Sequence, residues 1–280
     1  MQAHALTPRL VSALQPQTRP LELRDVEPKF PFLSVLASGG HTMLLYTASL
    51  TEHSMIATTV DAAIGDCLDK IARVVLPPET ISTAKNTMYG ALLEEFAFAE
   101  NSRTLPSSSQ NGSKIETPDP QPQNPYPQED ITAGDYCVTN GRTAIYEYAV
   151  PRNREEELRR NMTQWGWAIN EPLSMTSGGM KSRSLELSFT GLTTKVERLI
   201  RHGMDRETGK FNKTERLPNC ISLEERRAIA REAMRAAFEH LANRVVLGLQ
   251  HIAVETANAA PVATIVMSGG VAANRFLRYM

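Results

Sequence analysis

The chain has little cysteine and no long apolar run, and both absences limit what it can be. Its cysteines, Cys67, Cys137 and Cys220, are odd in number and widely separated, so we expect neither a disulfide framework nor a structural zinc site. This usage suits a reducing compartment. No stretch approaches the ~20 apolar residues that a membrane span requires, so we expect no membrane partner.

An excess of charge of one sign is also absent. The 280 residues include 30 Lys and Arg and 31 Asp and Glu, which gives a formal net charge of -1. Global charge therefore neither requires nor excludes a nucleic-acid partner, and any RNA contact must come from a local basic patch. The first residues lack the features of a secretory signal or an amphipathic presequence, so we expect no targeting segment within this chain.

Two segments share one pattern, in which an apolar run ends at Ser-Gly-Gly. Ser38-Gly39-Gly40 follows Leu33–Ala37, and Ser268-Gly269-Gly270 follows Ala263–Met267. Glycine has no Cβ, so such pairs can adopt positive φ and let backbone N–H groups approach a phosphate. We expect the two segments to face each other from opposite halves of the molecule, as walls of one site for a nucleotide or an acyl-adenylate. The alternative for each is a plain turn.

The apolar periodicity predicts a mixed-sheet α/β architecture. The first two strands form a hairpin around residues 38–42, and a helix follows the third strand with Asp61 as its N-cap. A capping box at Ser222–Glu225 opens a long amphipathic helix. The expected strands are Phe32–Ala37, Met43–Tyr46, Ser54–Thr59 and Thr264–Met267, and the expected last helix is Val271–Met280.

Composition divides the chain into four regions. Residues 1–31 join an uncapped helical pattern to a proline-rich connector, and residues 32–100 carry the hairpin, the third strand and the helix after it. Residues 101–180 begin rich in proline and serine and contain a charged helical piece, which predicts a partly disordered insertion. Residues 181–280 carry the long helix and the last strand.

Four motifs occur at residues 30–42, 61–70, 187–192 and 266–275, and they read FPFLSVLASGGHT, DAAIGDCLDK, LSFTGL and VMSGGVAANR. Together they resemble the motifs of the tRNA N6-adenosine threonylcarbamoyltransferases (TsaD/Gcp), in the family's order. His41 stands where the bacterial and mitochondrial branch has histidine and the archaeal and cytosolic branch usually has asparagine. The resemblance therefore favours the mitochondrial branch.

The resemblance implies a two-lobed actin/Hsp70/sugar-kinase-like (ASKHA) fold with flanking helices, of which the N-terminal lobe is largely missing here. It implies transfer of a threonylcarbamoyl group from threonylcarbamoyl-adenylate to N6 of the adenosine beside the anticodon of tRNA (t6A formation). The adenylate is an activated mixed anhydride, so the enzyme has mainly to position it, stabilise charge and admit the base. The implied partners are tRNA, a Sua-type synthase that makes the adenylate, and a second copy in a homodimer. The implied location is mitochondrial, with cytoplasmic as the alternative.

The resemblance also implies roles for individual residues. The phosphate or acyl group would lie on the backbone of Leu36, Ala37, Ser38, Gly39 and Gly40. Asp69 would accept hydrogen bonds from the ribose hydroxyls, Gly90 would approach the nucleoside, and Asn274 would contact the nucleotide from the other lobe. The alternatives are a solvated helix aspartate paired with Lys or Arg for Asp69, and an ordinary helix-capping asparagine for Asn274.

The resemblance further implies one divalent metal ion, iron or zinc. The family holds it through an H-x-x-x-H pair on a helix and a distant aspartate, and His4 corresponds to the second histidine. The other ligands lie outside this chain, so we expect an incomplete metal site, a chain truncated at both ends, and little or no transferase activity from it alone.

Two other functions remain open. One is an ATPase or sugar kinase of the same fold. The other is a non-catalytic remnant that binds a partner or tRNA through a basic stripe on the long helix, made of Arg226, Arg227, Arg231 and Arg235. Interleaved glutamates make a solvated, ion-paired face the alternative to such a stripe.

Overall fold

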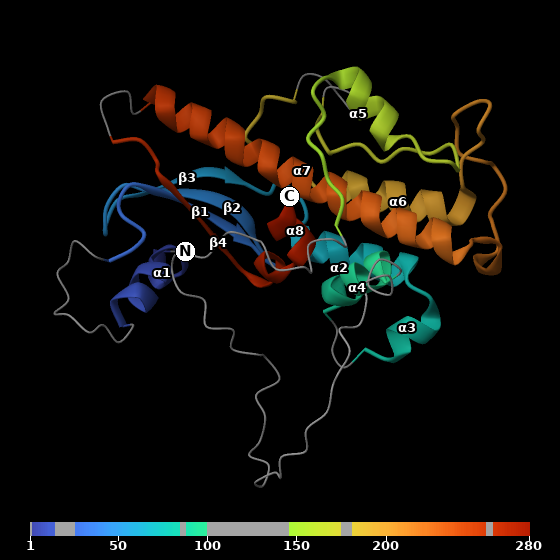
Figure 1. The fold of residues 1–280 in the computed structure, drawn as a ribbon, viewed down its shortest axis with the longest axis horizontal. Helices are drawn as coiled ribbons and strands as arrows, with labels where there is room; N and C mark the ends of the chain where they lie inside the picture. The colour runs from blue at the N-terminus through green and yellow to red at the C-terminus, as the bar shows by residue number, and fades with distance from the viewer. Residues whose placement is uncertain (1, 15–25, 85–87, 100–145, 175–180, 256–259) are drawn as a thin grey trace, which may run out of the picture.

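The computed structural model describes residues 2–14, 26–84, 88–99, 146–174, 181–255 and 260–280 (Figure 1). The strands are β1 (Phe32–Ala37), β2 (Thr42–Thr47), β3 (His53–Thr58) and β4 (Thr264–Ser268). The helices are α1 (Gln2–Leu14), α2 (Ile64–Val75), α3 (Pro78–Ser82), α4 (Gly90–Phe98), α5 (Arg154–Asn161), α6 (Thr190–His202), α7 (Leu223–Glu255) and α8 (Arg275–Tyr279), with 3-10 turns η3 (Pro218–Cys220) and η4 (Gly270–Ala273).

The strands form one mixed sheet in the order β3-β2-β1-β4. β1 pairs antiparallel with β2, β2 pairs antiparallel with β3, and β1 pairs parallel with β4. These pairings confirm the predicted hairpin, the third strand and the mixed sheet. β1 and β2 are almost entirely buried, which explains why both read as continuous apolar runs.

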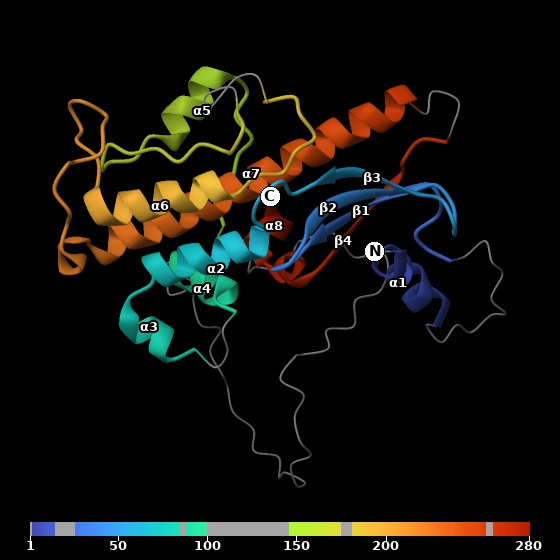
Figure 2. The same cartoon turned by 180° about the vertical axis from the view of Figure 1, so that it is seen from behind.

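The long helix α7 begins as the capping box predicts, because the backbone N–H of Glu225 donates to the hydroxyl of Ser222 at 3.1 Å. It runs along one side of the sheet, while α1 lies on the other side (Figures 1 and 2). A Cβ at Gly248 would lie 3.2 Å from the side chain of Ile56 and 3.3 Å from that of Leu44. Glycine at 248 thus lets α7 approach the sheet closely.

The helix α2 presents the apolar face that the sequence predicts. Ile64, Leu68, Ile71 and Val75 are all buried there, in a core shared with α4, α6 and α7. Burying a side chain of this size stabilises the fold by about 1.5–3 kcal/mol. This core fixes α2 beside the end of β1, where the first Ser-Gly-Gly segment lies.

The last predicted helix is wrong in one respect. Val271–Met280 is not continuous: it consists of η4 and α8, separated at Asn274. Asn274 has extended backbone angles, φ -63° and ψ 124°, and its side chain accepts a hydrogen bond from the N–H of Leu277 at 2.9 Å. A local side-chain bond thus begins a new helix where periodicity alone indicated a continuous one.

The predicted insertion lies partly outside the described residues, which resume at Tyr146. From there to Ser174 the chain packs against α7 and includes α5, which confirms the charged helical piece. Trp167 is fully buried, and its indole N–H donates to the carboxylate of Glu225 at 3.2 Å. The four regional boundaries stay predictions. Every described helix is too short or too polar to cross a membrane.

Candidate functional site

The two Ser-Gly-Gly segments lie next to each other at one edge of the sheet. β1 and β4 are parallel neighbours in which Leu36 pairs with Ser268, so both glycine pairs follow the carboxyl ends of adjacent strands. Ligands of open α/β sheets commonly bind outside the carboxyl ends of the strands. The predicted juxtaposition is confirmed, but the expectation of opposite halves of the molecule is wrong, because both segments belong to the same sheet.

Gly269 is the one glycine of the two pairs that adopts positive φ. Its angles are φ 98° and ψ 166°, and a Cβ there would collide with the carbonyl of Ala37. Gly39, Gly40 and Gly270 have no positive φ, and a Cβ on any of them would meet open space. The predicted positive φ is therefore confirmed at Gly269, which follows β4. It is wrong for Gly39 and Gly40, which follow β1.

The loop after β1 is closed by the backbone and by one side chain. The N–H of Ser38 donates to the carbonyl of His41 at 2.9 Å, and the hydroxyl of Ser38 accepts from the N–H of His41 at 3.0 Å. Gly65 in the first turn of α2 donates its N–H to the carbonyl of Ser38 at 3.1 Å, and a Cβ there would lie 2.7 Å from the nitrogen of Gly39. Gly39 and Gly40 remain exposed, so a ligand can approach their backbone.

The structure brings Asp69 and Gly90 together. Oδ1 of Asp69 accepts hydrogen bonds from the N–H groups of Tyr89 at 2.8 Å and Gly90 at 3.0 Å, the N-cap and the first residue of α4. Burial raises the pKa of Asp69, and these two bonds offset part of the increase. The alternative of a solvated, ion-paired helix aspartate is therefore wrong. The ribose contact stays a prediction.

Asn274 is buried, with 8% of its surface exposed, directly after η4. Its Oδ1 caps α8, and its Nδ2 lies 4.0 Å from the sulfur of Met234. The capping alternative is confirmed. It does not exclude the nucleotide contact, which stays a prediction. Asn274 would make that contact from the segment that follows β4, the strand that pairs with β1, and not from another lobe.

Asp61 is not the N-cap of α2, which begins three residues later without a side-chain cap. Its carboxylate instead accepts hydrogen bonds from the hydroxyl of Ser188 at 2.6 Å and the N–H groups of Phe189 at 2.9 Å and Thr190 at 3.3 Å. Burial acts to raise the pKa of Asp61, but these bonds and one from the N–H of Ala62 outweigh it and lower the pKa. Asp61 thus caps α6 from a distant part of the chain. This contact joins the motif at residues 61–70 to the motif at residues 187–192.

The residue predicted to bind a metal ion belongs to α1. His4 lies in that helix, but its side chain is outside the described part of the structure. Among the described residues, no three His, Cys, Asp or Glu side chains gather so that they could hold a metal ion. The described residues therefore form no complete metal centre, and a role of His4 as a ligand stays a prediction.

The arginines of α7 form neither a basic stripe nor a solvated face. Arg226 and Arg235 are buried, and Arg227 and Arg231 are half-buried. Arg226 donates to the carbonyl of Val75 at 2.8 Å, and Arg231 donates to that of Ala97 at 3.0 Å. The basic stripe and the solvated face are both wrong, because these guanidinium groups bind backbone inside the fold. The predicted ion pairing is confirmed for Arg235, which pairs with Glu232 and Glu239.

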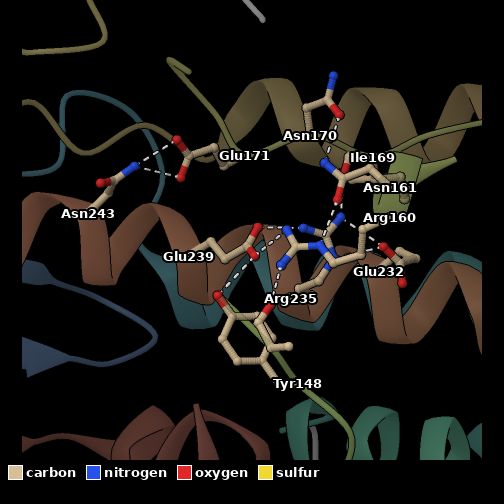
Figure 3. Close-up of polar contacts among 11 residues, drawn as sticks. Tyr148, Arg160, Asn161, Ile169, Asn170, Glu171, Glu232, Arg235, Glu239 and Asn243 are labelled. Atoms are coloured by element: carbon tan, nitrogen blue, oxygen red, sulfur yellow. Dashed lines mark hydrogen bonds and ion pairs between the residues drawn. The ribbon is translucent and has the colours of Figure 1, made fainter. Parts of the chain in front are cut away.

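A polar network that the sequence did not predict attaches the segment from Tyr146 to Ser174 to α7 (Figure 3). Glu239 lies at its centre, where it pairs with Arg235, accepts from Arg160 at 2.6 Å and accepts from the hydroxyl of Tyr148 at 3.1 Å. Nearby, burial and the charge of Glu239 raise the pKa of Glu171 to about 6. The network serves the packing of this segment against α7.

The sequence of the chain matches those of known proteins. A family model described as tRNA N6-adenosine threonylcarbamoyltransferase (TsaD) matches residues 9–115. Over all 280 residues the chain is 28% identical to the mitochondrial tRNA N6-adenosine threonylcarbamoyltransferase of Schizosaccharomyces pombe, and it covers 43% of that protein. It is 36% identical over 75 residues to the enzyme of Buchnera aphidicola, across 27% of this chain and 18% of that protein, and 39% identical over 69 residues to that of Dichelobacter nodosus, across 23% of this chain and 20% of that protein.

The fold and the edge of the sheet define an α/β protein with adjacent glycine segments beside α2. These matches make the chain similar in sequence to the tRNA N6-adenosine threonylcarbamoyltransferases, the family whose motifs it resembles. It spans less than half the length of the relatives reported above.

Proposed function

We propose that the protein to which this chain belongs transfers a threonylcarbamoyl group from its adenylate to N6 of the adenosine beside the anticodon of tRNA, and that this chain carries the adenylate site. The observation that carries the proposal is the pair of Ser-Gly-Gly segments at the ends of parallel β1 and β4, the first of which lies within the region that the family model matches. We further propose that the sheet belongs to an ASKHA fold.

The geometry supports a division of roles at this edge. The exposed backbone of Gly39 and Gly40 offers N–H groups to the phosphate or the acyl oxygen, without side chains in the way. Oδ1 of Asp69 is engaged by Tyr89 and Gly90, whereas no described residue donates to its Oδ2. That oxygen is available to a ribose hydroxyl, as the family role requires.

These residues would act by positioning. The adenylate carries its own leaving group, so a site that orients its carbonyl carbon toward the incoming amine and stabilises developing charge with fixed N–H donors accounts for most of the catalysis. The AMP that leaves would stay bound to the same glycine backbone until product release.

Cofactor, partners and location complete the proposal. The partners are tRNA, a Sua-type synthase that supplies the adenylate, and a second copy of the protein. A divalent metal ion with His4 among its ligands would serve the intact protein by holding the threonylcarbamoyl group, and the mitochondrial relative supports a mitochondrial location.

Two measurements test the function. The first is calorimetric titration of the 280-residue chain with a threonylcarbamoyl-adenosine analogue in which a sulfamate replaces the phosphate. We expect saturable binding that AMP displaces and CMP does not, with Asp69→Ala weakening it and Asp66→Ala leaving it unchanged.

The second measurement follows the transfer of a labelled threonylcarbamoyl group from synthetic adenylate to tRNA, which is then digested to nucleosides. Because the described residues hold no metal centre, we expect the chain to turn over well below the fission-yeast relative. Absence of analogue binding would contradict the proposal.

A further inference from the structure

We propose that Glu94 is a positioning residue of the nucleotide site: it holds Asn274 in register with Asp69 and Gly90. The inference rests on the proposed function and adds to it a residue outside the glycine segments and outside the four motifs. Glu94 lies on α4, and the element that it holds is α8.

One carboxylate oxygen of Glu94 carries the connection. Oε1 accepts hydrogen bonds from the N–H of Arg275 at 2.9 Å, the N–H of Phe276 at 3.0 Å and the hydroxyl of Tyr146 at 2.7 Å. The two N–H groups are the first of α8 and directly follow Asn274. Such N–H groups have no partner within their own helix, so Glu94 fixes the start of α8 from another element.

The other end of α4 is fixed on Asp69. The N–H of Gly90, the first residue of α4, donates to Oδ1 of Asp69, and Glu94 follows four residues later. At 1.5 Å per residue this places Glu94 about 6 Å along the helix, roughly one turn. The first turn of α4 is thus a spacer of fixed length between Asp69 and the residues that follow Asn274.

Apart from its contact with Met234, Asn274 makes local hydrogen bonds: its N–H donates to the carbonyl of Val271, and its Oδ1 accepts from the N–H of Leu277. It sits between a 3-10 turn and a helix of five residues, and a helix this short is unstable in water without tertiary contacts. Phe276 provides one such contact, because its buried ring packs against Phe98 at 5.0 Å between centroids and against Tyr146 at 5.7 Å. Loss of Glu94 would therefore leave α8 docked by this ring while its first turn, and with it Asn274, lost its alignment.

A double-mutant cycle with AMP as the probe tests the inference. Glu94→Ala and Asn274→Ala should each weaken AMP binding by about tenfold, as expected for one lost hydrogen bond to a charged or well-placed group. If Glu94 acts through Asn274, the double variant should bind within about threefold of Asn274→Ala alone, since coupled residues are not additive. Glu95→Ala, on the adjacent exposed carboxylate, is the matched control and should bind as the wild type does.

A conservative variant separates alignment from folding. Glu94→Gln keeps an acceptor oxygen for the N–H groups of Arg275 and Phe276, so it should restore AMP affinity to within about threefold of wild type. Thermal unfolding of each variant shows whether it is folded. If Glu94→Ala does not fold, the AMP affinity of Glu94→Gln is compared with that of the wild type instead. Equal affinity of Glu94→Ala and wild type, or fully additive losses in the cycle, would overturn the inference while leaving the site in place. An absence of AMP binding by the wild type would overturn the proposed function itself.

Discussion

Gly269 approaches the carbonyl of Ala37 so closely that no side chain fits between the ends of β4 and β1. This contact joins the two Ser-Gly-Gly segments into one edge of the sheet, although they are about 230 residues apart in the sequence. The same edge packs against Gly65 at the start of α2, which leads to Asp69. Close backbone packing thus brings the candidate site residues together before any ligand binds.

Gly269→Ala should destabilise the fold. The backbone angles at 269 belong to a region that is almost exclusive to glycine, which alone costs a residue with a side chain about 1–3 kcal/mol. The collision with Ala37 adds to that cost. Urea unfolding followed by circular dichroism measures it. The control is Gly270→Ala, where a Cβ meets open space and the change should stay within about 0.5 kcal/mol. Equal effects would argue against the geometry of this edge.

Asp61→Ala should lower the stability of α6 by about 0.5–2 kcal/mol, the usual cost of a lost N-cap. Its lowered pKa adds a pH dependence with a defined sign: the contribution is present above pH 3.8, the ordinary value, and is lost as pH falls through the lower value of the folded state. Asp66→Ala is the control, because its pair with Lys70 is a surface contact within one helix. Hydrogen exchange of the first turn of α6 should quicken in Asp61→Ala alone.

His240 should make the protein less stable in mild acid. Burial, and then the charge of Arg244, lower its pKa to about 3, so the unfolded chain takes up a proton below pH 6.5 that the folded chain refuses. The free energy of unfolding is therefore unaffected by this proton above pH 6.5. Below pH 6.5 it falls by about 1.4 kcal/mol per pH unit. Glu171 acts in the opposite direction, because its raised pKa favours the folded state at low pH.

The difference between wild type and His240→Gln isolates this effect. Free energies of unfolding measured from pH 7 to pH 5 should fall more steeply in the wild type than in His240→Gln. Parallel curves for the two proteins would show that His240 is protonated in the fold, contrary to its buried contacts with Ser188 and Phe189.

Part of this arrangement could be predicted from the sequence, because it follows from local periodicity. The hairpin, the strand before Gly269 and the capping box at Ser222 depend on neighbouring residues, and all three are confirmed. The local sequence predicts the wrong helix for the cap made by Asp61, because its partner Phe189 lies 128 residues away. A capping rule that considers only adjacent residues cannot identify such a partner.

The arginines of α7 show the second limit. Helical spacing correctly places Arg231 and Arg235 on one face, but spacing does not reveal whether that face meets solvent. In the structure Arg235 is 5% exposed and binds the carbonyl of Ile169 and the carboxylates of Glu232 and Glu239. The spacing of the glutamates on α7 predicts them as ion-pair partners. It does not predict that the segment from Tyr146 to Ser174 covers them.

Arg235→Met should destabilise the protein by about 1–3 kcal/mol, because it removes one of the two cations that pair with the half-buried Glu239 (Figure 3). The segment that begins at Tyr146 should then become more open to limited proteolysis. Arg159→Met is the matched control: its pair with Glu155 is exposed, and its loss should cost at most about 0.5 kcal/mol. Similar protease sensitivity in both variants would contradict the role of the network.

The most direct test of the central claim is photolabelling of the 280-residue chain with 8-azido-AMP, followed by peptide mapping. A nucleotide held at the shared edge of β1 and β4 should label peptides that contain Gly39–Thr42, Tyr89–Leu92 or Gly269–Asn274, and unlabelled AMP should suppress that labelling. Labelling confined to α5 or to residues 203–217, or labelling that AMP does not suppress, would contradict the claim that this edge binds the adenylate.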